Sequence, residues 1–145
     1  MNTQTIEAVG GLRANLAPDA FARWARHYHA CMIGFASPDP FSPVPYFLLC
    51  RSLELSLKAR HLRTKTQEEV RKRFGHELGK SYAALPPTEQ ILSPDELALL
   101  ESASTIYADK KTAGFEYFNP EDALTGFKRY PDLAALQSLA AKLLL

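Results

Sequence analysis

The chain has 145 residues, of which 46% are hydrophobic and 23% are charged, and its formal net charge is +1. This length suits one domain with its own core, and the composition excludes a disordered or membrane-embedded chain. We therefore expect a single domain over residues 1–145. Residues 1–17 contain Gly10-Gly11 and show no clear periodicity, so we expect them to form a loose arm.

The sequence has no feature that would place it in or across a membrane. No apolar run approaches the ~20 residues needed to span a bilayer. The segment from Met1 to Ala17 lacks the basic start and apolar stretch of a signal peptide. We expect a cytoplasmic protein that makes no membrane contact.

Charge is distributed unevenly along the chain. Residues 51–80 carry nine Lys or Arg against four acidic residues, whereas residues 81–145 carry five against nine. A basic middle and an acidic tail fit an anionic ligand, or complementary faces that pair between subunits. A solvated charged surface is the simpler alternative.

Apolar periodicity predicts a first helix from Pro18 to about residue 36, followed by a segment with four prolines between residues 37 and 45. The apolar residues of this first helix recur at three- and four-residue steps: Phe21, Trp24, Ala25, Tyr28, Cys31, Met32 and Phe35. A second helix should run from about Pro45 to Thr64. It is apolar over most of its circumference, which is typical of a central helix.

Three further helices follow from capping patterns. Thr66-Gln-Glu-Glu69 predicts a third helix from about Gln67 to Leu85. Ser93-Pro-Asp-Glu96 starts a fourth that continues to about Lys111. Asn119 should cap a short helical turn, and a last helix follows Pro131. We predict an all-α fold, an antiparallel helical bundle of about five helices.

A polar stripe marks one side of the second helix: Arg51, Glu54, Lys58, His61 and Lys65. Glu54 and Lys58 lie one turn apart and could simply form a helix salt bridge. His61 is expected at the surface or at a helix cap. No glycine-rich phosphate loop, Cys/His metal spacing or nucleophile elbow occurs, so we expect no metal site and no cofactor.

His76 is the candidate for acid–base chemistry. In a continuous third helix it would be surrounded by Lys72, Arg73 and Lys80, which should hold its pKa near or below the usual value. An imidazole that titrates near neutral pH can act as a general acid or base. With Arg71 stabilising charge on a phosphate, His76 could cleave RNA without a metal ion.

Arg71 and His76 have four residues between them, and this spacing alone is weak evidence, because Arg23 and His29 have a similar one. On a straight helix the two side chains would point about 140° apart. To bring them together, the long arginine side chain would have to wrap around the helix, the helix would have to distort at Gly75, or a second subunit would have to supply its own copy. We expect a homodimer.

A wider pattern accompanies the pair. Residues Pro45–Lys58 and Glu68–Leu78 resemble the hairpin "Glu-Leu-x-Leu-Lys … Gly-His-Asp/Glu-Leu" of small bacterial proteins of the HEPN superfamily. The resemblance covers residues 45–85 well, and it extends to the flanking helices only in outline. It implies Arg71 as a phosphate stabiliser and His76 as an acid or base, with Glu54 and Lys58 as matching residues on the preceding helix.

Many HEPN proteins are metal-independent endoribonucleases of toxin–antitoxin or defence systems, with the motif at a dimer interface. Active members often have Asn, Asp or His directly after the motif arginine, where this chain has Lys72. Three functions therefore stay open: a module that binds a nucleotide, RNA or a partner such as a nucleotidyltransferase-type protein; a ribonuclease that uses Arg71 and His76; and a structural adaptor. The residues expected to bind are Arg51, Glu54, Lys58, Lys72, Arg73 and Lys80.

Overall fold

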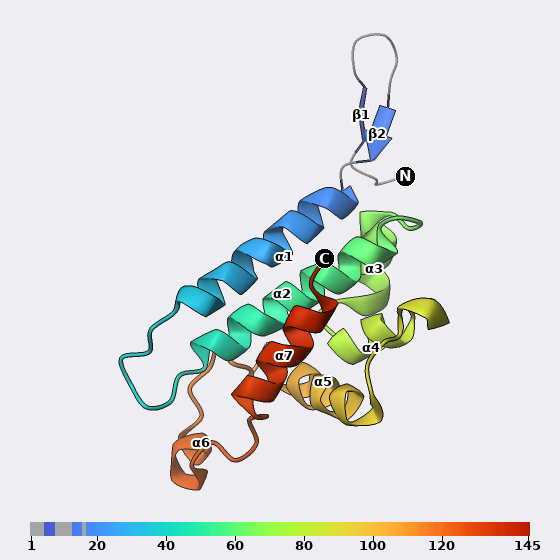
Figure 1. The fold of residues 1–145 in the computed structure, drawn as a ribbon. Helices are drawn as coiled ribbons and strands as arrows, with labels where there is room; N and C mark the ends of the chain where they lie inside the picture. The colour runs from blue at the N-terminus through green and yellow to red at the C-terminus, as the bar shows by residue number, and fades with distance from the viewer. Residues whose placement is uncertain (1–4, 8–12, 16) are drawn as a thin grey trace.

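The computed structural model of the chain describes residues 5–7, 13–15 and 17–145. In this part of the chain the fold consists of α-helices after a short N-terminal strand pair, which confirms the predicted all-α class (Figure 1). The helices are α1 (Ala17–Gly34), α2 (Val44–His61), α3 (Gln67–Phe74), α4 (Leu78–Ala83), the 3-10 helix η1 (Pro87–Glu89), α5 (Pro94–Tyr107), α6 (Pro120–Thr125) and α7 (Leu133–Leu143). None of them is long and apolar enough to cross a membrane.

The N-terminal segment contains a strand pair that the sequence did not indicate. Strand β1 (Thr5–Glu7) pairs antiparallel with β2 (Arg13–Asn15), and Ile6 is opposite Ala14. The pair lies beyond the first turn of α1 (Figure 1). The rest of the expected loose arm, residues 1–4, 8–12 and 16, lies outside the described residues.

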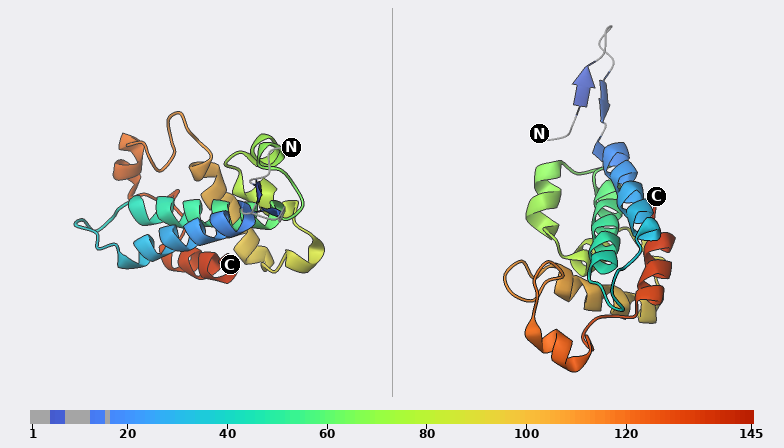
Figure 2. Two further views of the ribbon diagram at one scale, coloured as in Figure 1. Left: turned by 90° about the horizontal axis from the view of Figure 1, so that it is seen from above. Right: turned by 90° about the vertical axis from the view of Figure 1, so that its left-hand side faces the viewer.

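The central position of α2 is confirmed. It contacts α1, α4, α5 and α7, and the two views of Figure 2 show α1 and α7 lying beside it. Twelve of its 18 residues are buried, including the polar residues Ser52, Glu54, Ser56 and His61. A buried carboxylate in a central helix requires partners from its neighbours, because an unpaired buried charge is very costly.

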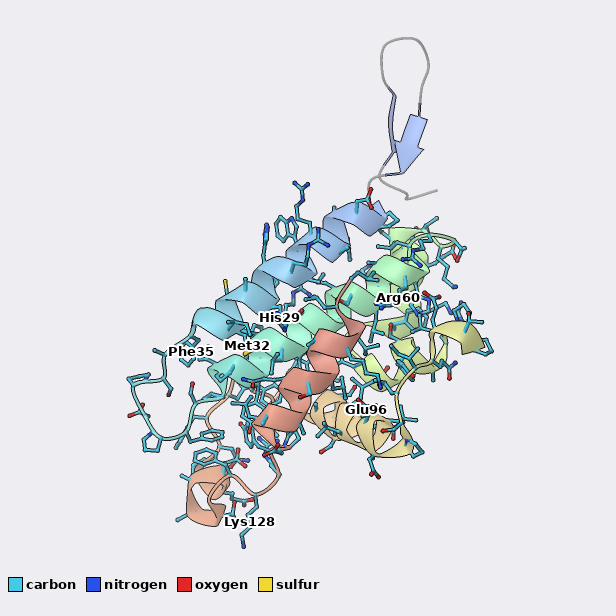
Figure 3. All side chains as sticks on the ribbon, in the orientation of Figure 1. His29, Met32, Phe35, Arg60, Glu96 and Lys128 are labelled. Carbon is cyan, nitrogen blue, oxygen red and sulfur yellow. The ribbon has the colours of Figure 1, made fainter. Side chains whose placement is uncertain are left out.

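Helix α1 packs on α2 through a narrower face than its apolar pattern predicts. Ala25 and Met32 are buried, and Met32 points from α1 toward α2 and α7 (Figure 3). Trp24, by contrast, is 57% exposed, and Cys31 is exposed as well. One large aromatic side chain of the predicted face therefore remains open to solvent.

The predicted helix starts are confirmed by their caps. The Thr66 hydroxyl accepts a hydrogen bond from the Glu69 amide at the start of α3. Ser93 and Glu96 form a complete capping box at α5, and Asn119 caps α6 through the Glu121 amide. These signals are local to each helix start, which is why the sequence reveals them.

The predicted continuous helix from residue 67 to 85 is wrong, because it breaks at Gly75. Gly75 has a φ of +52°, a region that side chains with a Cβ rarely adopt. Helix α4 restarts at Leu78, whose amide donates to the Ser104 hydroxyl of α5 at 2.8 Å. His76 therefore lies in a turn between two helices. The described ranges contain seven α-helices, whereas about five were predicted. The difference arises because the third helix is split into α3 and α4, and because the short turn after Asn119 forms α6.

A small apolar cluster fixes α3 to the adjoining ends of α1 and α2. It contains the buried residues Ala17, Leu62, Val70 and Phe74, with Phe21 packed against it. The main core lies between α2, α4, α5 and α7. Since α3 is held separately from the main core, a space remains between α2, α3 and the turn at Gly75.

Candidate functional site

A cleft of about 380 Å³ lies at this junction of α2, α3 and the turn after α3. This volume falls within the range of small-ligand pockets. Its charged and imidazole-bearing lining residues are Arg51, Glu54, Lys58, Glu68, Arg71 and His76. Five of these six side chains belong to the predicted catalytic and binding residues, which the fold brings together from α2, α3 and the turn.

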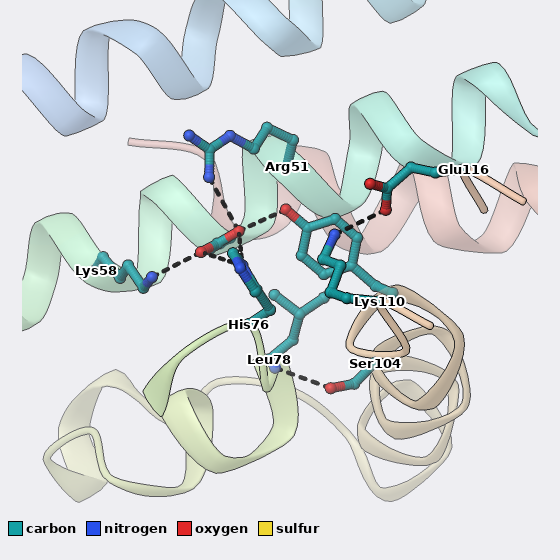
Figure 4. A network of polar contacts seen from close by, with 9 residues as sticks. Arg51, Lys58, His76, Leu78, Ser104, Lys110 and Glu116 are labelled. Carbon is teal, nitrogen blue, oxygen red and sulfur yellow. Dashed lines mark hydrogen bonds and ion pairs between the residues drawn. The ribbon is translucent and has the colours of Figure 1, made fainter. Parts of the chain in front are cut away.

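Glu54 is the centre of the polar network. Its side chain is 3% exposed, and its carboxylate accepts hydrogen bonds from four side chains, three of which are labelled in Figure 4. Lys58 Nζ lies 2.6 Å from Oε2 and Arg51 Nη1 lies 3.1 Å from Oε1. The Tyr107 hydroxyl of α5 lies 2.5 Å from Oε1, and His76 Nδ1 lies 3.1 Å from Oε2.

These partners keep Glu54 ionised. Burial alone would raise the pKa of its carboxyl, but Lys58, Tyr107 and Arg51 together lower it to about 2. Burial and the adjacent Glu54 charge raise the pKa of the Tyr107 hydroxyl well above its usual range. The carboxylate is therefore charged and the phenol is neutral at physiological pH. The Glu54–Lys58 salt bridge predicted as the simple alternative does form, as one contact of this larger network.

The ionised carboxylate also determines the orientation of His76. A charged carboxylate can only accept hydrogen bonds, so the Nδ1 atom of His76 must be the donor. In the neutral ring, Nε2 is then the nitrogen that can accept a proton. The His76 side chain is 47% exposed, and its ring meets Tyr107 edge-on with centroids 6.0 Å apart.

Arg71 lines the same cleft from α3. Its side chain is exposed, and among the described residues its guanidinium makes no ion pair or hydrogen bond. Because the helix ends before His76, the angle of about 140° expected for a straight helix does not apply. Arg71 and His76 line one cleft within a single chain, so a second subunit is not needed to bring them together.

Three predicted binding residues do not line the cleft. Lys72 is exposed and pairs with Glu68, with Nζ 2.9 Å from Oε1. The Arg73 guanidinium lies 5.2 Å from the centre of the Phe74 ring, and Lys80 is exposed on α4. The continuous helix that was expected to carry these three cations around His76 ends at Gly75, and the cations that share the cleft with His76 are Arg51, Lys58 and Arg71.

His61 is buried, which contradicts its predicted surface position. Its ring stacks on Phe74 with centroids 4.4 Å apart. The Nε2 N–H donates to the Ser81 carbonyl at 2.8 Å. Burial lowers the pKa of this imidazole. His61 thus connects α2 to α3 and α4, and it does not line the cleft.

Tyr107 was missed as a site residue. It lies on the apolar face of α5 and is 53 residues away from Glu54 in the sequence. Its periodic position resembles that of an ordinary core residue, and it does pack in the core, at 1% exposure. A buried glutamate in the central helix is the signal that could have led to it, because such a carboxylate needs a donor from a neighbouring helix.

Comparison of the chain with models of protein families, with curated proteins and with solved structures found no match. Among the residues that the structure describes, no group of three or more His, Cys, Asp or Glu side chains could hold a metal ion. The geometry of the cleft therefore carries the functional argument.

Proposed function

We propose that the protein is a HEPN-like helical module that binds a phosphate group of RNA or of a nucleotide in the cleft between α2 and α3. The observation that carries this proposal is Arg71, an exposed guanidinium in the cleft without a carboxylate partner among the described residues. A guanidinium can donate two parallel hydrogen bonds to a phosphate. The hairpin's resemblance to HEPN proteins supports the same ligand class.

The other charges of the cleft are compatible with an anion. Glu54 is neutralised by Arg51 and Lys58, and Glu68 is paired with Lys72. The carboxylates that would repel a phosphate therefore each have a cationic partner. Arg71 contributes uncompensated positive charge, and Lys58 and Arg51 add further donors at the cleft wall.

Binding of a labelled single-stranded RNA, followed by fluorescence anisotropy in EDTA, tests this function. We expect binding that weakens with salt. Arg71→Ala should reduce the affinity about tenfold, which corresponds to the free energy of one hydrogen bond from a charged donor. Lys128→Ala removes the same charge from an exposed site near α6, at the other end of the molecule (Figure 3). This control should alter affinity by less than about twofold.

Competition with nucleoside monophosphates separates a nucleotide site from an RNA site. A monophosphate that displaces the RNA at a similar concentration would identify a nucleotide site, and weak displacement would identify an RNA site. If RNA, nucleotides and heparin all fail to bind, the proposed function is wrong.

A second candidate function, favoured by the Glu54–His76 contact, is a metal-independent endoribonuclease. With Nδ1 donating to Glu54, Nε2 of His76 can take the proton of a 2′-hydroxyl, whose oxygen then attacks the adjacent phosphorus. The 5′-oxygen leaves with a proton from water, and a 2′,3′-cyclic phosphate remains. Arg71 would stabilise the charge that builds up on the phosphoryl oxygens.

Cleavage assays separate this candidate from simple binding. An active protein should cut single-stranded RNA in EDTA and leave DNA of the same sequence intact, because DNA lacks the 2′-hydroxyl. His76→Ala should abolish the cut while RNA binding is retained. RNA that stays intact at high protein concentration would exclude the nuclease and leave the binding function in place.

The HEPN resemblance also supports a proposed biological setting. It favours a homodimer that acts in a bacterial defence or toxin–antitoxin system, with a nucleotidyltransferase-type protein as a partner. The molecular mass in solution tests the first part, since a dimer would be about twice the 16.2 kDa of the chain. A monomer at all accessible concentrations would contradict it.

A further inference from the structure

The exposed tryptophan of α1 stands beside a second groove. Trp24 is the single tryptophan of the chain, and it is 57% exposed. The groove has a volume of about 290 Å³, and its lining residues are Ala20, Phe21, Trp24, Arg51 and Leu55. A large aromatic side chain at the edge of an apolar groove is a common feature of binding sites.

This groove adjoins the cleft that holds Arg71 and His76. Phe21, Arg51 and Leu55 line both spaces. Arg51 lies between them, with its guanidinium 5.7 Å from the centre of the Tyr28 ring and Nη1 3.1 Å from Glu54. The same side chain therefore borders a charged space on one side and an aromatic one on the other.

We propose that the groove binds a nucleobase, stacked on Trp24, of the same nucleotide or RNA strand whose phosphate lies in the neighbouring cleft. This inference rests on the proposed function: the cleft would bind the phosphate of the ligand, and the groove would bind its base. Every nucleobase has a π face that can stack on an indole ring, so such a site tolerates different sequences. Phe21 and Leu55 supply apolar walls, and Arg51 supplies a cation for the base or its adjoining phosphate.

The charge around the groove favours a nucleic acid over an apolar protein segment. Arg23 is exposed next to Trp24 on α1, and Arg51 is part of the groove itself. A polyanion benefits from the Arg23 charge and from the N–H groups that Arg51 does not donate to Glu54, whereas an apolar helix would have to cover them. The groove is also smaller than the adjoining cleft, which suits one planar ring.

Tryptophan fluorescence tests the inference directly, since emission comes from Trp24 alone. The probes are a single-stranded RNA and an abasic strand of equal length, which has the same phosphates without bases. RNA should quench Trp24 emission, and the abasic strand should bind without quenching it. Anisotropy should show that Trp24→Ala lowers RNA affinity about tenfold and leaves abasic-strand affinity unchanged, while Trp24→Phe keeps most of the RNA affinity.

Ile33→Ala is the matched control. Ile33 is 68% exposed on the same helix, and it lines neither of the two spaces. Its loss should leave RNA affinity unchanged, and circular dichroism should show that all variants are folded.

Two results would overturn this inference alone: equal quenching by both strands, or full RNA affinity in Trp24→Ala. If the second result came with a change of oligomeric state, it would assign the groove to a protein contact. If neither strand binds the unaltered protein, the proposed phosphate-binding function fails first, so the two failures are distinguishable.

Discussion

His76 Nδ1 lies 3.1 Å from the Oε2 atom of Glu54, although the two residues are 22 positions apart in the sequence. This contact joins the turn after α3 to the centre of α2. It exists because the chain leaves the helix at Gly75 and directs His76 toward a buried carboxylate. The candidate site therefore depends on one backbone conformation and one buried charge.

The backbone at Gly75 gives the first prediction. An added Cβ would meet no atom within 4 Å, yet the φ of +52° is unfavourable for any other residue. Gly75→Ala should therefore cost roughly 1–3 kcal/mol of unfolding free energy through backbone strain alone. Gly34→Ala is the matched control, because Gly34 also has open space around it but is the last residue of α1 and does not have a positive φ. It should stabilise the protein slightly. Equal effects in urea unfolding would contradict the strained turn.

Loss of the Glu54 charge gives the second prediction. Glu54→Gln leaves Arg51 and Lys58 without their shared counter-ion. Breaking a buried ion pair typically lowers the unfolding free energy by roughly 3–5 kcal/mol. Because Lys58 and Arg51 are only partly buried, we expect the loss in this variant to lie at or below the low end of that range. Glu77→Gln, which alters an exposed carboxylate next to His76, should change the unfolding free energy by less than about 0.5 kcal/mol. A stable Glu54→Gln protein would show that the network is unimportant for folding.

Acid should weaken the fold through the same carboxylate. The Glu54 pKa is lowered to about 2 in the folded protein from an ordinary 4.5. The unfolded chain then binds the proton more readily, so this stabilisation is complete above about pH 4.5 and is lost as the pH falls toward 2. The loss should be on the order of 3 kcal/mol, and Glu54→Gln should lack it. Urea unfolding of both proteins at several pH values between about 5 and 2 gives their unfolding free energies. If these free energies fall with pH equally steeply in both proteins, the prediction is wrong.

A second acid effect should come from His61 at higher pH. Burial lowers the pKa of its ring below the ordinary 6.5, so the folded state holds it neutral when the unfolded chain already takes up a proton. Its contribution to stability is therefore complete above about pH 6.5 and declines as the pH falls below that value. His61→Gln keeps an N–H donor for Ser81 and should flatten this part of the profile. His27→Gln, at an exposed position of α1, should leave it unchanged.

The features predicted correctly from the sequence are those that depend on local residues. Thr66, Ser93 and Asn119 cap their helices through amides two or three residues away, and such patterns can be read directly. The central position of α2 followed in the same way from its wide apolar surface.

The break at Gly75 depends on distant groups. The new helix start is satisfied by the Ser104 hydroxyl of α5, 26 residues from Leu78, and His76 gains a partner from α2. The sequence does not show which distant side chains will satisfy the backbone groups that a helix break leaves free. A glycine followed by a histidine is therefore as compatible with a continuous helix as with a broken one. For the same reason the sequence does not show that Tyr107 donates to Glu54, and the apolar pattern of α1 does not show that Trp24 is exposed.

The ring nitrogens of His76 offer the most direct test of the whole account. Nitrogen NMR of protein labelled at its histidines should show the neutral ring of His76 protonated at Nδ1. Addition of single-stranded RNA should shift the Nε2 signal of His76 and leave the signal of His29 in place. A neutral ring protonated at Nε2 would contradict the hydrogen bond from His76 to Glu54, and RNA shifts that bypass His76 would contradict the proposed phosphate site.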